Sequence, residues 1–219
     1  MIQAVLFDLD GTLADTALDL GGALNRLLAR NGLPAVPMAQ IRPVASHGAN
    51  YLIKLGTGIE KGHPDHPRWR EEYLAEYEHG FCDETVLFEG INPMLGQLAR
   101  RNIAWGIITN KPHRFTSLLV PELGFIAPPA VVVSGDTCAE PKPSTLPMHH
   151  ACKQIGIAPE RCLYVGDAER DMVAGKNAGM ATALANWGYI AESDPVHEWP
   201  ADARLDAPGQ IWICCSRIA

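Results

Sequence analysis

From about residue 93 onward, short apolar runs alternate with segments that have the apolar spacing of helices. The predicted strands lie at 103–108, 130–133, 162–165 and 182–184, with a last short strand at 203–205. The intervening helices are expected at 94–101, from residue 112, at 144–155 and after residue 167. Such alternation is typical of βαβ units, which build a parallel sheet with helices on both faces. We therefore predict an α/β protein with a Rossmann-like core.

The first apolar run of the chain stands far from the rest of the predicted sheet. It covers residues 2–7 and ends in a tight Gly-Thr turn, whereas the next predicted strand begins only at residue 103. A parallel crossover needs only about a dozen residues, so most of the intervening chain is surplus to the sheet. We predict a cap domain, residues 15–84, inserted into a core made of residues 1–14 and 85–219.

The predicted cap is all-helical. Asp15 or Thr16 is expected to cap its first helix, and Asn31-Gly32 provides a stop signal. The segment Ser46-His47-Gly48 interrupts the second helix. The three stretches with helical spacing are about 18–28, 40–55 and 68–79.

Composition limits the classes of partner. The formal net charge of −7 argues against a general nucleic-acid binder, which needs a basic field. No stretch approaches the roughly 20 uninterrupted apolar residues of a membrane span, and no signal peptide is evident. We expect a cytoplasmic monomer or homodimer with neither a nucleic-acid nor a membrane partner.

The cysteines form no Cys-x-x-Cys motif and are expected to be reduced, with metal binding or redox activity at Cys214-Cys215 as the alternative.

Polar groups follow four of the predicted strands or their connections. They are Asp8 and Asp10, Thr109-Asn110, Lys142, and Asp167 with Asp171. Ligands of open α/β sheets bind beyond the carboxyl ends of the strands, so we expect these groups to meet in one crevice. Carboxylates crowded there repel one another and resist desolvation unless a cation compensates. The pattern indicates a metal-dependent active site, although Asp8 to Gly11 alone could be an ordinary turn.

Taken together and in order, these motifs resemble the haloacid dehalogenase-like hydrolases over essentially the whole chain. The motifs are Asp8-x-Asp10-Gly11-Thr12, Thr109-Asn110, Lys142-Pro143 and Gly166-Asp167-x-x-x-Asp171. Leu13-x-Asp15-Thr16 and the insertion at the first loop are similar to the phosphoglycolate phosphatase-like branch. Further segments are similar to bacterial N-acetylmuramic acid 6-phosphate phosphatases, namely Leu87-Phe88-Glu89-Gly90, Trp105-Gly106, Lys111-Pro112 and Trp187-Gly188-Tyr189.

The resemblance implies roles for the core residues. Asp8 would attack phosphorus to form an aspartyl-phosphate, and Asp10 would act first as general acid and then as general base. Mg²⁺ would offset the roughly 8 kcal/mol by which a carboxylate and a phosphate dianion repel at ~4 Å and an effective dielectric of about 20. Lys142 would bridge the nucleophile and a phosphate oxygen. The Mg²⁺ ligands would be Asp8, the backbone carbonyl of Asp10, Asp167 and, as an outer or auxiliary ligand, Asp171.

Other residues are candidates for substrate contact. Thr109 and Asn110 would hold phosphate oxygens, and Lys111 would add positive potential. In the cap, Ser46, His47 and Gly48 could approach the substrate, because glycine lets the backbone come close to a ligand; a kink between packed helices is the alternative. Arg42 is a candidate partner for a substrate carboxylate. Trp187-Gly188-Tyr189 is expected to pack in the core and close a loop, or else to form a pocket rim, and the histidines are expected at the surface.

These inferences predict a Mg²⁺-dependent phosphatase that hydrolyses a small phosphorylated metabolite. Phosphoglycolate is the default substrate of the branch, and N-acetylmuramic acid 6-phosphate is the alternative, since both carry a carboxylate besides the phosphate. A mutase would instead yield phosphorylated sugars. A catalytically inactive protein that binds a phosphorylated ligand is the alternative from another class, and the complete set of Asp8, Asp10, Lys142 and Asp167 argues against it.

Overall fold

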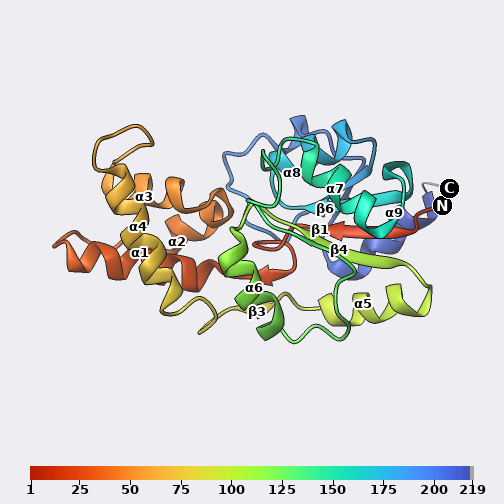
Figure 1. Cartoon of the computed structure of the whole chain (residues 1–219), viewed down its shortest axis with the longest axis horizontal. Coiled ribbons are helices and arrows are strands. Elements are labelled where there is room, and N and C mark those ends of the chain that lie inside the picture. Colours follow the sequence, from red (N-terminus) through yellow and green to blue (C-terminus); the bar gives the residue numbers. More distant parts are fainter. Residues whose placement is uncertain (218–219) are drawn as a thin grey trace.

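A six-stranded parallel sheet forms the centre of the protein (Figure 1). The computed structural model describes residues 1–217, with side chains up to residue 214. The strand order is β5-β4-β1-β6-β7-β8, and each neighbouring pair is parallel, which confirms the predicted α/β sheet. The strands are β1 Ala4–Phe7, β4 Ala104–Ile108, β5 Val132–Val133, β6 Cys162–Gly166, β7 Ala181–Ala185 and β8 Ala203–Leu205.

Helices cover both faces of this sheet. In β1, Ala4 and Leu6 pack into the apolar cluster of α7 and α8, whereas Val5 and Phe7 pack into that of α5, α6 and α9. Side chains of a strand alternate between its two faces, so one strand serves two cores. Figure 1 shows α7 and α8 on one side and α5 and α6 on the other. The helices are α5 Ile91–Arg100, α6 His113–Glu122, α7 Leu146–Ile155, α8 Glu169–Asn177 and α9 Ile211–Arg217.

Four helices between β1 and β4 form a separate group at one end of the molecule, which we call the helical lobe (residues 17–78; Figure 1). They enclose an apolar cluster of their own, which includes Leu24, Leu28, Ile53 and Tyr73. The helices are α1 Ala17–Arg30, α2 Met38–Ile41, α3 Ala49–Thr57 and α4 His66–Glu78. The expected interruption of the second helical stretch is present, because η1 (Arg42–His47) and Gly48 separate α2 from α3.

A short antiparallel pair joins the lobe to the sheet. β2 (Ala14–Asp15) pairs with β3 (Val86–Leu87), so the two chain connections of the lobe run side by side. The sequence did not indicate these strands, since two residues are too short to show any periodicity. The remaining short helices are η2 Pro159–Arg161, η3 Val196–Glu198 and η4 Pro208–Gln210.

The start of α1 differs from the prediction. Thr16 occupies the N-cap position, but neither it nor Asp15 caps the helix with its side chain. The Thr16 hydroxyl instead donates to Asp10 Oδ1 at 2.7 Å. The backbone N–H groups of Thr16 and Ala17 donate to the phenol oxygen of Tyr189, at 2.6 and 2.9 Å. A residue distant in sequence thus satisfies donors that helix starts leave free.

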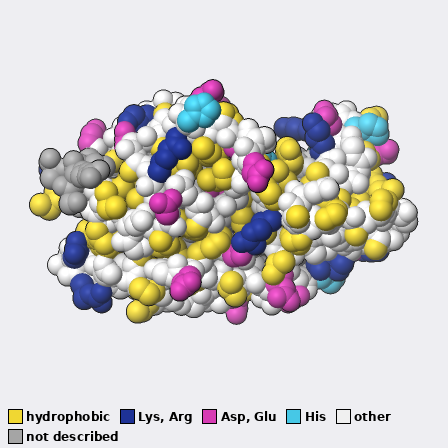
Figure 2. Space-filling model, turned by 180° about the vertical axis from the view of Figure 1, so that it is seen from behind, with side chains coloured by type: hydrophobic (Ala, Val, Ile, Leu, Met, Phe, Trp, Pro, Cys, Tyr) yellow, Lys and Arg dark blue, Asp and Glu magenta, His cyan; other side chains and the backbone are white. Residues whose placement is uncertain are grey.

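The remaining predictions concern membrane partners, surface charge and the state of the cysteines. None of the described helices is long and apolar enough to cross a membrane. On the face in Figure 2, Lys and Arg side chains of the described chain are separated by acidic and apolar ones.

The described cysteines whose state can be read are thiols. The Cys152 and Cys162 sulfurs lie 3.7 Å apart without a disulfide bond, and Cys82 and Cys138 are also thiols. Cys214 is buried, and the side chain of Cys215, the other half of the predicted pair, lies outside the described residues.

Candidate active site

The two aspartates after β1 have different environments. Asp8 is 2% exposed, and its Oδ1 accepts a hydrogen bond from the Leu9 N–H at 2.8 Å. Asp10 Oδ1 instead lies 2.9 Å from Lys111 Nζ, besides accepting the Thr16 hydroxyl. Asp8 is therefore fixed within the core, whereas Asp10 is held beside the start of the helical lobe.

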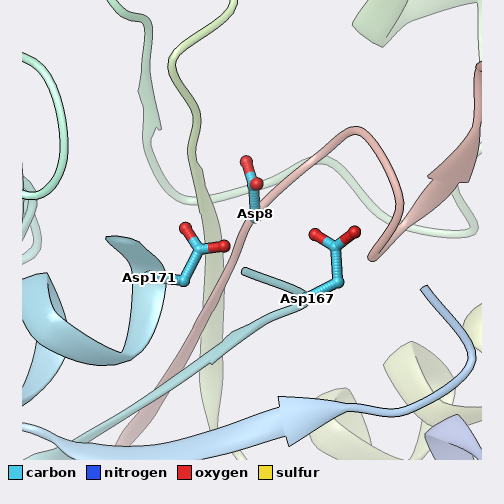
Figure 3. A group of neighbouring side chains, drawn as sticks. All are labelled: Asp8, Asp167 and Asp171. Atoms are coloured by element: carbon cyan, nitrogen blue, oxygen red, sulfur yellow. The ribbon is translucent and has the colours of Figure 1, made fainter. Parts of the chain in front are cut away.

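Asp8, Asp167 and Asp171 form a buried acidic group (Figure 3). Asp167 follows β6, and Asp171 lies in the first turn of α8. One carboxylate oxygen from each residue lies within 4.8 Å of the others. Burial, reinforced by the charges of Asp8 and Asp171, raises the pKa of Asp167 well above its ordinary value. Buried oxygen ligands that repel one another in this way suit a hard divalent cation.

Two loops close tightly around Asp167. Gly11 has φ +84°, and a Cβ there would meet Asp167 Oδ2 at 2.1 Å. A Cβ at Gly188 would meet the Cβ of Asp167 at 2.2 Å. The Tyr189 N–H donates to Asp167 Oδ2 at 2.9 Å, and the Thr12 hydroxyl donates to Oδ1 at 3.3 Å. The glycines of Asp-Gly-Thr and Trp-Gly-Tyr are thus required by close approach of the backbone.

Lys142 lies completely buried beside the acidic group. Its Nζ lies 3.0 Å from Asp8 Oδ1 and 2.7 Å from Asp171 Oδ1. It also donates to the Ile108 carbonyl at 2.8 Å and to the Tyr164 hydroxyl at 2.7 Å. An ammonium has three N–H donors, so these acceptors engage all of them. Burial raises the pKa of Asp171, although Lys142 opposes the shift.

The Asn110 amide, predicted to hold a phosphate oxygen, lines the cavity and also binds the backbone of Lys142. Its Nδ2 donates to the Lys142 carbonyl and its Oδ1 accepts the Lys142 N–H, both at 2.9 Å. The amide therefore positions the backbone of the lysine, and sequence spacing could not reveal this pairing across 32 residues. Thr109 is buried, and its hydroxyl oxygen accepts the Lys111 N–H at 3.2 Å.

A cavity of about 490 Å³ lies between the sheet end and the helical lobe. The core side of its wall includes the predicted site residues Asp8, Asp10, Thr109 and Asn110. The lobe side includes Ser46, His47, Gly48 and Arg70. The structure therefore brings the predicted core and lobe segments to opposite walls of one cavity.

Arg42 does not line this cavity, which corrects its expected place beside the substrate. Its Nη2 lies 2.7 Å from Asp15 Oδ2, and its guanidinium lies 5.5 Å from the centre of the Tyr189 ring. Tyr189 in turn donates its hydroxyl to Asp15 Oδ1 at 2.9 Å. These three side chains bind one another at the base of the lobe, an arrangement that depends on contacts remote in sequence.

Sequence reasoning missed Arg170. It lines the cavity, and its Nη2 lies 3.8 Å from Asp8 Oδ2. The available signal was its position directly before Asp171, inside the Gly166-Asp167-x-x-x-Asp171 motif at the start of a predicted helix. A side chain in that turn lies at the same sheet edge as the two aspartates.

The fold and this group of residues define a class of hydrolases. The chain belongs to the haloacid dehalogenase-like hydrolase family, whose sequence model matches residues 5–185. The resemblance that the motifs indicated is thereby confirmed.

Particular relatives within this family extend over nearly the whole chain. A phosphoglycolate phosphatase from Xanthomonas campestris pv. campestris is 41% identical over 215 residues, covering 96% of this chain and 95% of the relative. An N-acetylmuramic acid 6-phosphate phosphatase from Pseudomonas aeruginosa is 35% identical over 210 residues, covering 96% and 93%. The crystal structure of a predicted phosphoglycolate phosphatase from Haemophilus somnus has the same fold, with a TM-score of 0.86 at 23% identity and 98% coverage of both chains.

Proposed function

We propose that this protein hydrolyses a phosphate monoester of a small metabolite through an aspartyl-phosphate on Asp8. The observation that carries the proposal is the placement of Asp8 on the cavity wall, beside Lys142 and within the acidic group. The Leu9 N–H and Lys142 both bind Oδ1, which fixes the orientation of the carboxylate. A nucleophile that is held in this way avoids the entropy cost of being positioned during attack.

The acidic group fits Mg²⁺ as the cofactor. Asp8 and Asp167 would hold the ion, and Asp171, whose oxygens bind Lys142 and the Ala168 N–H, would act as an auxiliary ligand. When bound, the ion would neutralise the charge that a phosphate adds to this site. Oxygen ligands without cysteine or histidine favour a hard cation.

Asp10 would transfer the protons of the reaction. Its side chain lies on the cavity wall and is bound by the Thr16 hydroxyl and Lys111. The first step would give a proton to the leaving alkoxide, and the second would take one from the attacking water. Lys111 stabilises the carboxylate that remains after the first transfer. Burial lowers the pKa of Lys111, but the charge of Asp10 outweighs this effect, so the pKa of Lys111 lies above its ordinary value and its ammonium stays charged.

We further propose that residues 15–84 act as a cap over the site. The paired strands β2 and β3 carry both connections to this segment, and the cavity lies between it and the sheet. Closure of such a cap would exclude water from the aspartyl-phosphate until hydrolysis. Ser46, His47 and Gly48 would contact the organic part of the substrate, together with the exposed Arg70.

Phosphoglycolate is the first candidate substrate, because the Xanthomonas relative named for this activity covers nearly the whole chain. N-acetylmuramic acid 6-phosphate is the second candidate. The cavity volume of about 490 Å³ favours it, since a two-carbon ester fills only a small part of such a space. We also propose action in the cytoplasm as a monomer or homodimer, which suits the thiols and a soluble metabolite.

Release of inorganic phosphate from a panel of monoesters tests this function. The panel contains both candidate substrates, a sugar phosphate and p-nitrophenyl phosphate, each assayed with Mg²⁺ and with a chelator. We expect Mg²⁺-dependent release that falls on the order of a thousandfold in Asp8→Asn. Asp65→Asn, at an exposed position of the lobe, is the matched control. Phosphate-ester binding without turnover would instead identify the inactive binding protein.

A further inference from the structure

Arg70 differs from the other arginines of the helical lobe in having no acidic partner among the described residues. Arg70 is exposed on α4 and lines the cavity between the lobe and the sheet end, whereas the other lobe arginines do not line it. Those other arginines all form ion pairs, namely Arg26–Glu76, Arg30–Glu76, Arg42–Asp15 and Arg68–Glu72. The lobe therefore presents one uncompensated positive charge to the cavity.

The acidic side chains of the cavity wall already have other partners. Asp8 and Asp10 each have a lysine ammonium within 3.0 Å. Asp136, the third carboxylate on the wall, accepts a backbone N–H at 2.8 Å through its Oδ1. The charge of Arg70 is thus left for a group that enters the cavity.

A second polar group on the lobe wall lacks a partner. Ser46 Oγ is buried and makes no hydrogen bond with the described residues, and Ser46 lines the same cavity as Arg70. A buried hydroxyl without a partner is rare in proteins and calls for one. A guanidinium and a hydroxyl can both donate hydrogen bonds, so this wall suits an acceptor that carries negative charge.

The position of Arg70 along α4 sets its separation from the proposed chemistry. Arg70, Tyr73 and Tyr77 have helical spacing and all line the cavity, so they lie on one face of α4. The Tyr77 ring centre lies 4.6 Å from Lys111 Nζ, which in turn lies 2.9 Å from Asp10 Oδ1. Arg70 precedes Tyr77 by about two helical turns, or about 10 Å along the axis. Side chains of a helix lean toward its N-terminus, so Arg70 leans away from this end of the cavity.

We propose that Arg70 determines substrate specificity by binding, together with Ser46, a carboxylate of the substrate. The inference rests on the proposed function, because the phosphate held at Asp8 fixes the other end of the substrate. A guanidinium binds a carboxylate through two parallel hydrogen bonds. The separation along α4 selects an ester in which a spacer the size of a sugar ring lies between phosphate and carboxylate. Of the two candidate substrates, N-acetylmuramic acid 6-phosphate fits this requirement and the two-carbon phosphoglycolate does not.

A pair of matched esters tests the assignment. N-acetylglucosamine 6-phosphate has the phosphorylated amino-sugar ring of N-acetylmuramic acid 6-phosphate but lacks its lactyl carboxylate. Initial rates would give kcat/KM for both sugars and for phosphoglycolate in wild type, Arg70→Gln and Arg70→Lys. The control is Arg68→Gln, which changes an exposed arginine of α4 that pairs with Glu72 and does not line the cavity.

Only the sugar that carries the carboxylate should respond to Arg70. We expect its kcat/KM to fall about tenfold in Arg70→Gln, because a charge-assisted hydrogen-bonded pair is lost. Arg70→Lys should give a smaller loss, since it keeps the charge without the planar fork. The other two esters should change by less than about twofold, because they offer Arg70 no carboxylate at that distance. Arg68→Gln should match wild type on all three esters.

Several outcomes would overturn the assignment. They are equal losses on all three esters in Arg70→Gln, an unchanged kcat/KM for the sugar acid, and wild type that uses both sugars equally well or prefers phosphoglycolate. Titration calorimetry with N-acetylmuramic acid 6-phosphate in Asp8→Asn, with and without Arg70→Gln, measures binding without turnover. A Kd that rises about tenfold on adding Arg70→Gln, when wild type hydrolyses no ester, would contradict only the proposed function.

Discussion

The sheet end and the helical lobe meet at the same cavity but hold their polar groups differently. At the sheet end, Asp167 and Lys142 are buried, and protein groups bind them on several sides. On the lobe side, Ser46 Oγ is buried without a hydrogen-bond partner among the described residues, and Arg70 is exposed. The protein thus satisfies the polar groups of the sheet end on several sides, whereas Arg70 on the lobe side lines the cavity and is exposed.

Tyr189 connects the two regions. Its backbone N–H binds Asp167 in the acidic group, and its hydroxyl binds the start of α1 and Asp15 in the connection to the lobe. Its ring is buried. One residue therefore links the position of a proposed metal ligand to the base of the lobe.

The largest expected effect comes from removing the charge at the sheet end. Lys142→Met removes the cation that contacts both Asp8 and Asp171 and leaves only Arg170, 3.8 Å from Asp8, and breaking such a buried group costs about 3–5 kcal/mol. Chemical denaturation measures the loss in free energy of unfolding. Lys54→Met in the lobe breaks an exposed ion pair with Glu60 and should leave stability unchanged. Similar losses in both variants would show that the two regions do not differ as described.

A smaller effect is expected at the connection between the regions. Tyr189→Phe leaves the Thr16 and Ala17 N–H groups without their acceptor and Asp15 Oδ1 without its donor, which should lower the free energy of unfolding by about 1–3 kcal/mol. Mg²⁺ affinity should not change, because the backbone N–H that binds Asp167 remains. The control is Tyr51→Phe, at a tyrosine that is 41% exposed on α3. A loss of Mg²⁺ affinity in Tyr189→Phe would mean that the phenol itself holds the acidic group.

The smallest expected effect is on the pH dependence of stability, through His47 of the lobe. Burial, aided by the charge of Arg170, lowers the pKa of His47, while Asp194 opposes the shift. Below the unfolded pKa of about 6.5, the unfolded chain therefore binds more protons than the folded protein. Stability contributed by this shift is present above that pH and decreases as the pH falls.

Thermal unfolding between about pH 7 and about pH 5 measures this dependence. His47→Gln should make the dependence slightly shallower, because glutamine does not titrate. His149→Gln, at an exposed histidine of α7, should keep the wild-type slope. A slope in His47→Gln that equals the wild-type slope would contradict the assignment to His47.

Local patterns predicted much of the fold. The strand β8 lies at 203–205, as expected, and the helices of the lobe fall within the three predicted stretches or extend them by a few residues. The carboxyl ends of β1 and β6 bring Asp8 and Asp167 together, as the rule for parallel sheets requires. By contrast, β2 and β3 were not predictable, because their pairing depends on chain segments about 70 residues apart.

The sequence alone therefore determined the parallel sheet, the helical character of the inserted segment and the strand ends that carry charge, since apolar periodicity and the alternation of strands with helices are properties of nearby residues. Only the tertiary structure decided how side chains pair across the site. It placed Arg42 on Asp15, gave the Asn110 amide to Lys142 and left the donors of Arg170 facing Asp8. The choice of partner for a long polar side chain depends on loops that meet only after folding, and no spacing in the chain encodes it.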